Sequence, residues 1–262
     1  EVYVTINISE GKSYLVREVK LAGNLLLQDS EYENLVLIKK DSIFSRKTVI
    51  ETRKNITDKL AELGYPFANV NIAPTIDDDS KTVALTVFVD PGRRTYVRRI
   101  NVGGNVKKKD EVIRRELRQQ ESDWMSSKQI ALSKQRLDRT GFFQEVTIDT
   151  PPVPGAQDQV DLNISVTERP TGNLTAGVGF SDTQGVTLNF SLAQENFMGT
   201  GDYVAITIDN SQVTKNYSFT IRDPYVTDAG VSRNFSIYSR KVDAEAANVS
   251  NYVINTEGVS LS

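Results

Sequence analysis

Cysteine and histidine are both absent from the 262 residues of the chain. Their absence excludes disulfides, thiolate and imidazole metal ligands, cysteine nucleophiles and every catalytic triad that uses histidine. The apolar runs are only a few residues long, so no transmembrane helix is expected. With 31 basic and 34 acidic side chains, the net charge of −3 creates no overall field that would attract nucleic acid. These absences nearly exclude an ordinary hydrolase or a zinc enzyme. We expect no enzyme, no metal, no cofactor and no nucleic-acid partner, and we look for partners in local surfaces.

The beginning of the chain shows neither the basic region nor the apolar region of a signal peptide. Apolar residues alternate with polar ones over the first segment, at Val2, Val4, Ile6 and Ile8. This alternation is typical of a strand. We interpret residues 1–11 as the end of a preceding domain, and the chain as a piece of a longer protein.

Charge is distributed unevenly along the chain. Residues 1–169 carry 51 charged side chains, whereas residues 170–262 carry 14. The segment Glu168–Gly172, which contains Pro170 and ends in glycine, lies at this change and is typical of a domain boundary. The boundary is predicted near Thr171, and the two parts are expected to have different surroundings.

The first part contains an internal repeat at an offset of about 77 to 82 residues. The matching pairs occur in the same order: Tyr14–Asn24 with Tyr96–Asn105, Leu60–Tyr65 with Leu137–Phe142, and Val83–Val87 with Val160–Ile164. Each unit has the pattern of a strand, a Gly-Asn turn, two helical stretches and two strands. We predict two α+β domains in tandem, residues 12–90 and 91–169.

Helical periodicity supports this interpretation in the first unit. Val49, Ile56, Leu60 and Leu63 form an apolar stripe, which Gly64 is expected to end as the residue after the helix. Trp124, the only tryptophan, is expected to be a core residue between the elements of the second unit.

Residues 170–262 show strand patterns only. About six strands of eight to ten residues alternate apolar side chains with small polar ones, as in Leu174, Ala176, Val178 and Phe180. A soluble β-domain would also alternate, but its outer face would usually carry more charge. The sparse charge favours a membrane barrel with lipid outside and water inside. Six strands cannot close such a barrel, so further strands are expected after Ser262.

Several motifs together resemble those of the POTRA-plus-barrel family of outer-membrane assembly proteins. They are Tyr96–Asn105, Val112–Arg118, Arg136–Phe143, Asp158–Asp161 with Val166–Arg169, Gln194–Gly201 and Asp223–Tyr225. The resemblance covers nearly the whole chain. It implies that residues 12–90 and 91–169 are the last two POTRA domains in the periplasm. Residues 170–262 would then be the N-terminal part of a transmembrane antiparallel β-barrel in the outer membrane of a Gram-negative bacterium.

The function implied by this resemblance is the folding and insertion of outer-membrane proteins. The implied partners are unfolded outer-membrane protein clients, periplasmic lipoproteins of an assembly complex, and outer-membrane lipid. Two alternatives stay open from the sequence. One is a POTRA–barrel transporter for two-partner secretion or autotransporter assembly, and the other is a soluble periplasmic protein-interaction module.

Edge strands are the first candidate sites. In a three-stranded sheet, one strand of each final pair must lie at an edge, where free backbone groups can accept an extended peptide. The candidate residues are Asn71, Ile72, Val146, Thr147 and Ile148. Alternatively, Pro74, Asp77–Asp79 and Pro151–Pro152 blunt these edges.

The first barrel strand is the second candidate site for client pairing. Gly177 and Gly179 lack side chains to pack against a neighbour, so the seam at this strand could open. The glycines could instead serve barrel curvature. The candidate residues are Asn173, Leu174, Thr175, Ala176, Gly177, Val178, Gly179 and Phe180.

The third candidate is a charged surface on a helix that is expected around Val112–Gln120. Val112, Ile113 and Leu117 are expected to be buried, while four charged residues are expected to project: Arg114, Arg115, Arg118 and Glu121. By resemblance they would contact a lipoprotein, although a solvated charged face is the commoner outcome. Lys107–Lys109 are interpreted as a solvated turn rather than a lipid-headgroup contact. Asn196–Gly201 are expected to form a tight turn with a structural role.

Overall fold

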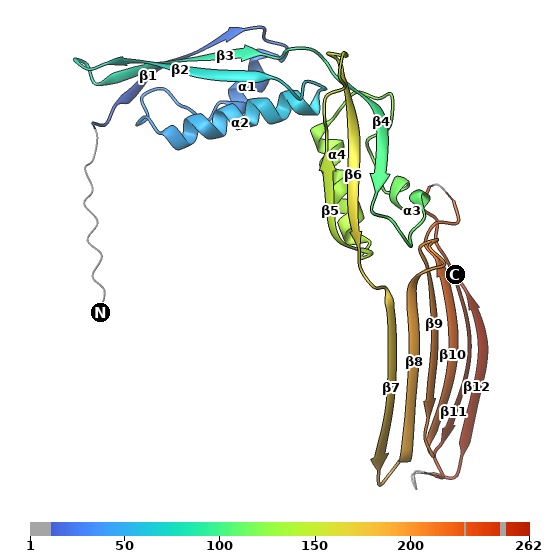
Figure 1. Cartoon of the computed structure of the whole chain (residues 1–262). Helices are drawn as coiled ribbons and strands as arrows, with labels where there is room; N and C mark the ends of the chain where they lie inside the picture. Colours follow the sequence, from blue (N-terminus) through green and yellow to red (C-terminus); the bar gives the residue numbers. More distant parts are fainter. Residues whose placement is uncertain (1–11, 228, 247–249) are drawn as a thin grey trace, which may run out of the picture. The chain divides into compact units, whose positions relative to one another are not determined.

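The computed structural model of the chain describes residues 12–227, 229–246 and 250–262 (Figure 1). The predicted end of a preceding domain at residues 1–11 lies outside the described residues. The chain forms two compact units. The first consists of the part up to Ile100 with Gln119–Ala131 and Thr150–Leu162. The second consists of Asn101–Arg118, Leu132–Asp149 and Asn163–Ser262.

The first repeat forms a three-stranded sheet with two helices on one face (Figure 1). Its elements are β1 (Leu15–Gly23), α1 (Asp29–Leu35), α2 (Arg46–Glu62), β2 (Asn69–Asp77) and β3 (Thr82–Asp90). The order is β1-β3-β2, with β1 parallel to the central β3 and β2 antiparallel to it. No helix in the described ranges is long and apolar enough to cross a membrane.

The core of this domain lies between the sheet and α1 and α2. Tyr32, Ile56 and Leu60 are fully buried and pack with Val87 of the central strand. The helical stripe is therefore confirmed at Ile56 and Leu60. At Leu63 it is wrong, because the helix has already ended there and the side chain is exposed. Gly64 follows with a positive φ of 98°, as predicted for the residue that ends the helix.

The second repeat has the same order of elements, which confirms the predicted pattern. They are β4 (Tyr96–Gly103), α3 (Asp110–Arg114), α4 (Ser127–Arg139), β5 (Phe143–Asp149) and β6 (Gln159–Glu168), in a sheet of order β4-β6-β5. Trp124 is not a core residue as expected, because it is 45% exposed. Its ring lies 4.2 Å under the guanidinium carbon of Arg94. The Arg94 Nε donates to the carbonyl oxygen of Leu63 at 3.1 Å, so this arginine joins the end of the first repeat to the second.

The Gly-Asn turns have the same geometry in both repeats. Gly23 and Gly104 have φ of 99° and 87°, in the left-handed region that favours glycine. A Cβ on Gly23 would clash with the carbonyl oxygen of Val89, and a Cβ on Gly104 with that of Val166. Both glycines therefore let the chain pass tightly over the end of the central strand. This shared requirement explains why the motif recurs in the sequence.

The Gly104→Ala substitution is expected to lower the free energy of unfolding by about 1–3 kcal/mol, the range for a non-glycine residue held in a sparsely populated conformation. The clash with Val166 puts the expectation at the upper end of this range. Gly103→Ala is the matched control, because a Cβ there meets nothing within 4 Å. Denaturant unfolding of both variants measures the difference. Equal stabilities would contradict the close approach.

The last part of the chain forms one antiparallel sheet of six strands. They are β7 (Gly172–Ser181), β8 (Gly185–Phe197), β9 (Asp202–Asn210), β10 (Thr214–Asp223), β11 (Arg233–Asp243) and β12 (Val253–Leu261). The order follows the sequence from β7 to β12. The prediction of about six strands is confirmed, although the strands are somewhat longer, at 9 to 13 residues.

Cross-strand pairing aligns the apolar residues of this sheet into rows. One row runs across all six strands through Leu174, Leu192, Ile206, Phe219, Ile237 and Val259. The neighbouring row on the opposite face consists of Thr175, Ser191, Thr207, Ser218, Tyr238 and Gly258. The apolar face is exposed, with Leu174 64% and Val178 78% accessible. The sheet therefore has one apolar and one largely polar face.

Candidate functional site

Strand β7 lies at the edge of the six-stranded sheet, with β8 as its neighbour. The Glu195 N–H donates to the carbonyl oxygen of Thr171 at 3.0 Å, which makes these two residues a hydrogen-bonded pair. Hydrogen-bonded and non-hydrogen-bonded pairs alternate along an antiparallel ladder. The odd-numbered residues of β7 therefore bond to β8. The even-numbered residues direct their backbone N–H and C=O groups to the other side, at Leu174, Ala176, Val178 and Phe180.

The two candidate glycines of β7, Gly177 and Gly179, differ in their surroundings. A Cβ on Gly177 would meet nothing within 4 Å, whereas a Cβ on Gly179 would lie 2.7 Å from the Thr187 Oγ1 of β8. Close packing against β8 therefore explains why position 179 is a glycine, but it does not explain the glycine at position 177. All eight candidate residues of the first barrel strand, Asn173 to Phe180, lie on β7 and are exposed.

The edges of the two small sheets are also where the sequence predicted them. Strands β2 and β5 each form one edge of their sheet, beside central β3 and β6, and β1 and β4 form the other edges. Pro74 lies within β2. Because a proline in a sheet is accommodated where its missing donor faces away from the ladder, it interrupts the open edge of β2 at that position. On β5, Thr147 is exposed, Ile148 is half-buried and Val146 is buried.

The charged surface near α3 differs from the prediction. Val112, Ile113 and Leu117 are buried as expected. Arg114 and Arg118 are exposed, and the Arg114 Nε lies 2.5 Å from the Asp110 Oδ2. Glu121 is exposed, but its Oε1 accepts the Ile100 N–H at 2.7 Å. The predicted helix over residues 112–120 is wrong beyond Arg114, because α3 has only five residues.

Arg115 does not project into solvent, and this part of the prediction is wrong. Its guanidinium carbon lies 4.3 Å from the centre of the Tyr225 ring, just after β10. Its Nη1 donates to the carbonyl oxygen of Thr200 at 3.2 Å. Arg136 of α4 donates to the Tyr225 hydroxyl at 3.0 Å and lies 2.8 Å from the Glu116 Oε2. Two arginines thus join the second repeat to the turns that follow β8 and β10.

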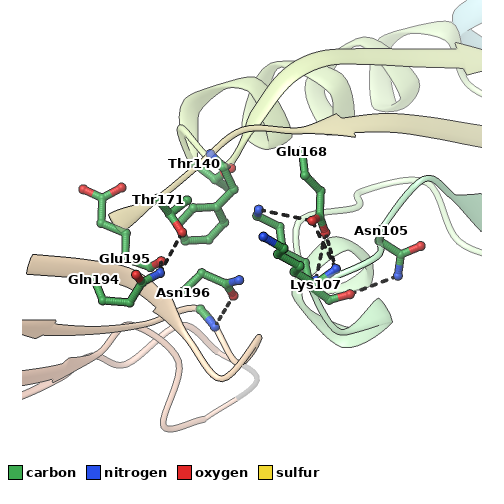
Figure 2. Close-up of polar contacts among 11 residues, drawn as sticks. Asn105, Lys107, Thr140, Glu168, Thr171, Gln194, Glu195 and Asn196 are labelled. Atoms are coloured by element: carbon green, nitrogen blue, oxygen red, sulfur yellow. Dashed lines mark hydrogen bonds and ion pairs between the residues drawn. The ribbon is translucent and has the colours of Figure 1, made fainter. Parts of the chain in front are cut away.

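A second set of contacts involves the loop of residues 105–109 (Figure 2). Both carboxylate oxygens of Glu168 accept the Lys107 N–H at 3.1 Å, and one accepts the Lys108 N–H at 2.8 Å. The Lys109 N–H donates to the carbonyl oxygen of Gly199 at 3.0 Å. The end of β6 therefore holds this loop, and the loop holds the turn between β8 and β9.

The turn between β8 and β9 is conformationally unusual. Asn196 and Met198 have φ of 66° and 50°, a conformation that non-glycine residues rarely adopt. The buried Asn196 Oδ1 accepts the Gly201 N–H at 2.9 Å and closes the turn. Figure 2 shows this turn beside Gln194, whose Nε2 donates to the Thr171 Oγ1 at 2.9 Å. Sequence reasoning identified the turn and missed its contacts with Arg115 and the loop 105–109.

Comparisons with known proteins agree with this architecture. The POTRA family model, described as a surface antigen variable number repeat, matches residues 14–92 and 95–169, and the Omp85 superfamily domain matches residues 196–262. The outer membrane protein assembly factor BamA of Neisseria meningitidis serogroup B is 32% identical over 261 residues. This alignment covers 98% of the present chain and 33% of that protein.

Solved structures show the same relationship. The crystal structure of BamA from Haemophilus ducreyi lacking POTRA domains 1–3 matches 95% of this chain with a TM-score of 0.80 and 32% identity. The match covers 47% of that structure's chain. POTRA domains 3–5 of Haemophilus influenzae BamA match 59% of this chain and 61% of theirs, with a TM-score of 0.54 and 40% identity.

The present chain therefore spans less than half the length of the Neisseria meningitidis BamA and of the chain in the Haemophilus ducreyi BamA structure. The two POTRA matches together cover more than half of the chain, and the Omp85 match lies within the six-stranded sheet. The chain belongs to the POTRA family and carries an Omp85 superfamily domain after its second repeat.

Proposed function

We propose that the chain is part of the core subunit of the machinery that folds and inserts outer-membrane proteins. Residues 12–90 and 91–169 are proposed as periplasmic POTRA domains, and residues 170–262 as the first strands of the barrel. Residues 1–11 would end the preceding POTRA domain. The protein would reside in the outer membrane of a Gram-negative bacterium. The resemblance to BamA over nearly the whole chain supports this assignment.

The observation that carries the proposal is the edge of β7 beside an exposed apolar face. Apolar side chains on such a face are stable against lipid chains, whereas their exposure to water is unfavourable in free energy. In hydrocarbon an unsatisfied backbone group costs several kcal/mol, so an edge strand there strongly favours a partner strand. The partner can be the closing strand of the barrel or a strand of an incoming client. Backbone pairing tolerates many sequences, which suits a range of unfolded clients.

The edges of the small sheets are proposed as earlier client contacts. On β2 the usable edge is the part before Pro74, which includes Asn71 and Ile72. On β5 it includes Val146, Thr147 and Ile148. Strand addition at these edges needs no catalytic side chain and no cofactor, so the proposed activity is not enzymatic.

Periplasmic lipoproteins of the assembly complex are proposed to bind beside α3 through Arg114, Arg118 and Glu121. Arg115 is removed from this surface because it contacts Tyr225 and Thr200. The Arg118→Glu substitution is expected to reduce lipoprotein recovery several-fold, because it reverses an exposed charge at the interface. Lys134→Glu is the control, an exposed basic residue on α4. Recovery that is equally high for both variants in a pull-down of the full-length protein would contradict this contact.

Reconstitution of the full-length protein in liposomes tests the proposed function. An unfolded outer-membrane protein added outside is expected to become membrane-integrated, protease-resistant and folded. A two-partner secretion or autotransporter-assembly protein would instead pass or mature only its own substrate and leave this client protease-sensitive. A full-length protein that stays monomeric in buffer without detergent would favour the soluble interaction module.

A further inference from the structure

A pocket of about 700 Å³ lies within the second compact unit, between the loop 105–109, the link after β6 and the turn between β8 and β9. Its lining includes Lys107, Lys108, Arg169, Gln194, Asn196 and Met198. We propose that this pocket binds the phosphate of an anionic phospholipid headgroup. The inference rests on the proposed function: residues 91–169 are there a periplasmic domain, and the turn between β8 and β9, which accepts a hydrogen bond from Lys109 of that domain, then lies at the periplasmic surface of the membrane.

Two polar side chains that line the pocket are buried. The Lys108 side chain is only 2% exposed, so the expected solvated turn is wrong at this residue, and Asn196 is 6% exposed. The Asn196 Oδ1 is used by the Gly201 N–H, while its Nδ2 has no hydrogen-bond partner among the described residues. This amide is therefore a donor available to a bound oxyanion. The positive φ of Asn196 is the kind of backbone strain that accumulates at binding sites.

The charges around the pocket do not balance. Three cationic residues, Lys107, Lys108 and Arg169, line the pocket together with one acidic residue, Glu168. Glu168 is already held by the N–H groups of Lys107 and Lys108. The Lys108 Nζ lies 3.9 Å from the Glu168 Oε2, which is too far for a strong hydrogen bond. The pocket is thus left with a net positive charge, and a second anion would complete it.

The state of Lys108 supports the same conclusion. Burial lowers the pKa of Lys108 from its usual value, and the nearby Glu168 offsets this effect only in part. Its Nζ lies 5.9 Å from the centre of the Phe142 ring and 5.5 Å from that of the Phe143 ring, so these two rings and the Glu168 carboxylate 3.9 Å away stabilise its charged form. A phosphate oxygen would provide the short, charge-assisted hydrogen bond that this ammonium group lacks.

A lipid is favoured over free phosphate by the apolar residues at the pocket. Met198 lines it and is 79% exposed, and the adjacent Phe197 is also exposed. Free phosphate has no group that would cover them, whereas the glycerol and first acyl carbons of a phospholipid would. Apolar side chains next to cations at the end of membrane strands are suited to the boundary between headgroups and acyl chains.

The test uses the full-length protein in nanodiscs of phosphatidylcholine mixed with phosphatidylglycerol, followed by native mass spectrometry of the retained lipids. The wild-type protein is expected to retain phosphatidylglycerol in preference. The double variant Lys107→Gln/Arg169→Gln is expected to lose about fivefold in retention per removed charge, the factor that corresponds to about 1 kcal/mol for a basic residue near an anionic surface. Lys109→Gln is the matched control, an exposed neighbour that does not line the pocket.

A second variant, Lys108→Met, removes the buried charge while Glu168 keeps its backbone donors. It is expected to fold with unchanged or higher stability and to lose the preference for phosphatidylglycerol. Inorganic phosphate, added as a competitor, distinguishes the two sources of the oxyanion. Competition at low millimolar concentration would overturn the lipid assignment, and so would equal lipid retention by wild-type, double and control variants. Failure of the wild-type protein to enter nanodiscs would instead contradict the proposed function.

Discussion

Proline in place of Ala176 is expected to abolish client assembly while β7 stays paired with β8. Ala176 is an even-numbered residue of β7, so its N–H faces the open edge and not β8. Proline removes this one donor and is accommodated in an edge strand when the donor faces outward. In the bilayer, the opposing carbonyl of a client strand would then lose its partner, at a cost of several kcal/mol. Client folding by the full-length protein, measured as protease resistance, provides the readout.

Two control variants separate strand addition from general damage. Ala176→Gly removes the methyl group but keeps the N–H, so client assembly is expected to remain close to wild-type. Thr175→Pro removes a donor that bonds to β8 and is expected to destabilise the sheet itself. Equal assembly activity of Ala176→Pro and Ala176→Gly would show that the edge of β7 does not bind the client.

The Arg115→Ala substitution is expected to release the second repeat from the turn between β8 and β9. It removes a cation–π contact with Tyr225 and a charged hydrogen bond to Thr200. Arg115 and Tyr225 are both half-buried, so their cation–π contact contributes about 0.5–2 kcal/mol, and a hydrogen bond to a charged group contributes about 1.5–3 kcal/mol. The backbone amides of Lys109 and Gly201 both donate hydrogen bonds to residues in or next to this turn. They are expected to exchange with solvent at least tenfold faster.

Arg115→Lys is the matched control for the contacts of Arg115 with Tyr225 and Thr200. Lysine keeps the charge, but it lacks the planar guanidinium that stacks on a ring while donating to a carbonyl. An intermediate increase in hydrogen exchange is expected for Arg115→Lys, with the largest increase for Arg115→Ala. Exchange rates at Lys109 and Gly201 that are unchanged in both variants would mean that Arg115 does not hold the turn.

The element order of the fold could be predicted because it depends on local patterns. Gly23 and Gly104 mark the same turn twice, since each lies over the end of a central strand where a Cβ has no room. The alternation in β7 and β8 was likewise readable, because each strand alone shows which residues share a face. The open edges of β2 and β5 followed from the number of strands in each small sheet.

The contacts between the second repeat and the turns after β8 and β10 could not be predicted, because they join residues that are distant in the sequence. Arg115 binds Thr200, 85 positions away, and Arg136 binds Tyr225, 89 positions away. A charge pattern near α3 cannot distinguish a solvated arginine from one that stacks on such a partner. Trp124 was misplaced for the same reason, because its neighbour Arg94 is supplied by the link between the two repeats.

Site-specific crosslinking during client assembly tests the central claim most directly. Because the chain lacks cysteine, Ala176→Cys and Tyr217→Cys each introduce a single thiol into the part of the protein that this chain comprises. The two positions share one cross-strand row on the apolar face, but Ala176 is on edge strand β7 and Tyr217 is on interior strand β10. A client with one cysteine in its terminal strand is expected to crosslink to position 176 and not to position 217. Equal crosslinking at both positions, or none at 176, would contradict strand addition at β7.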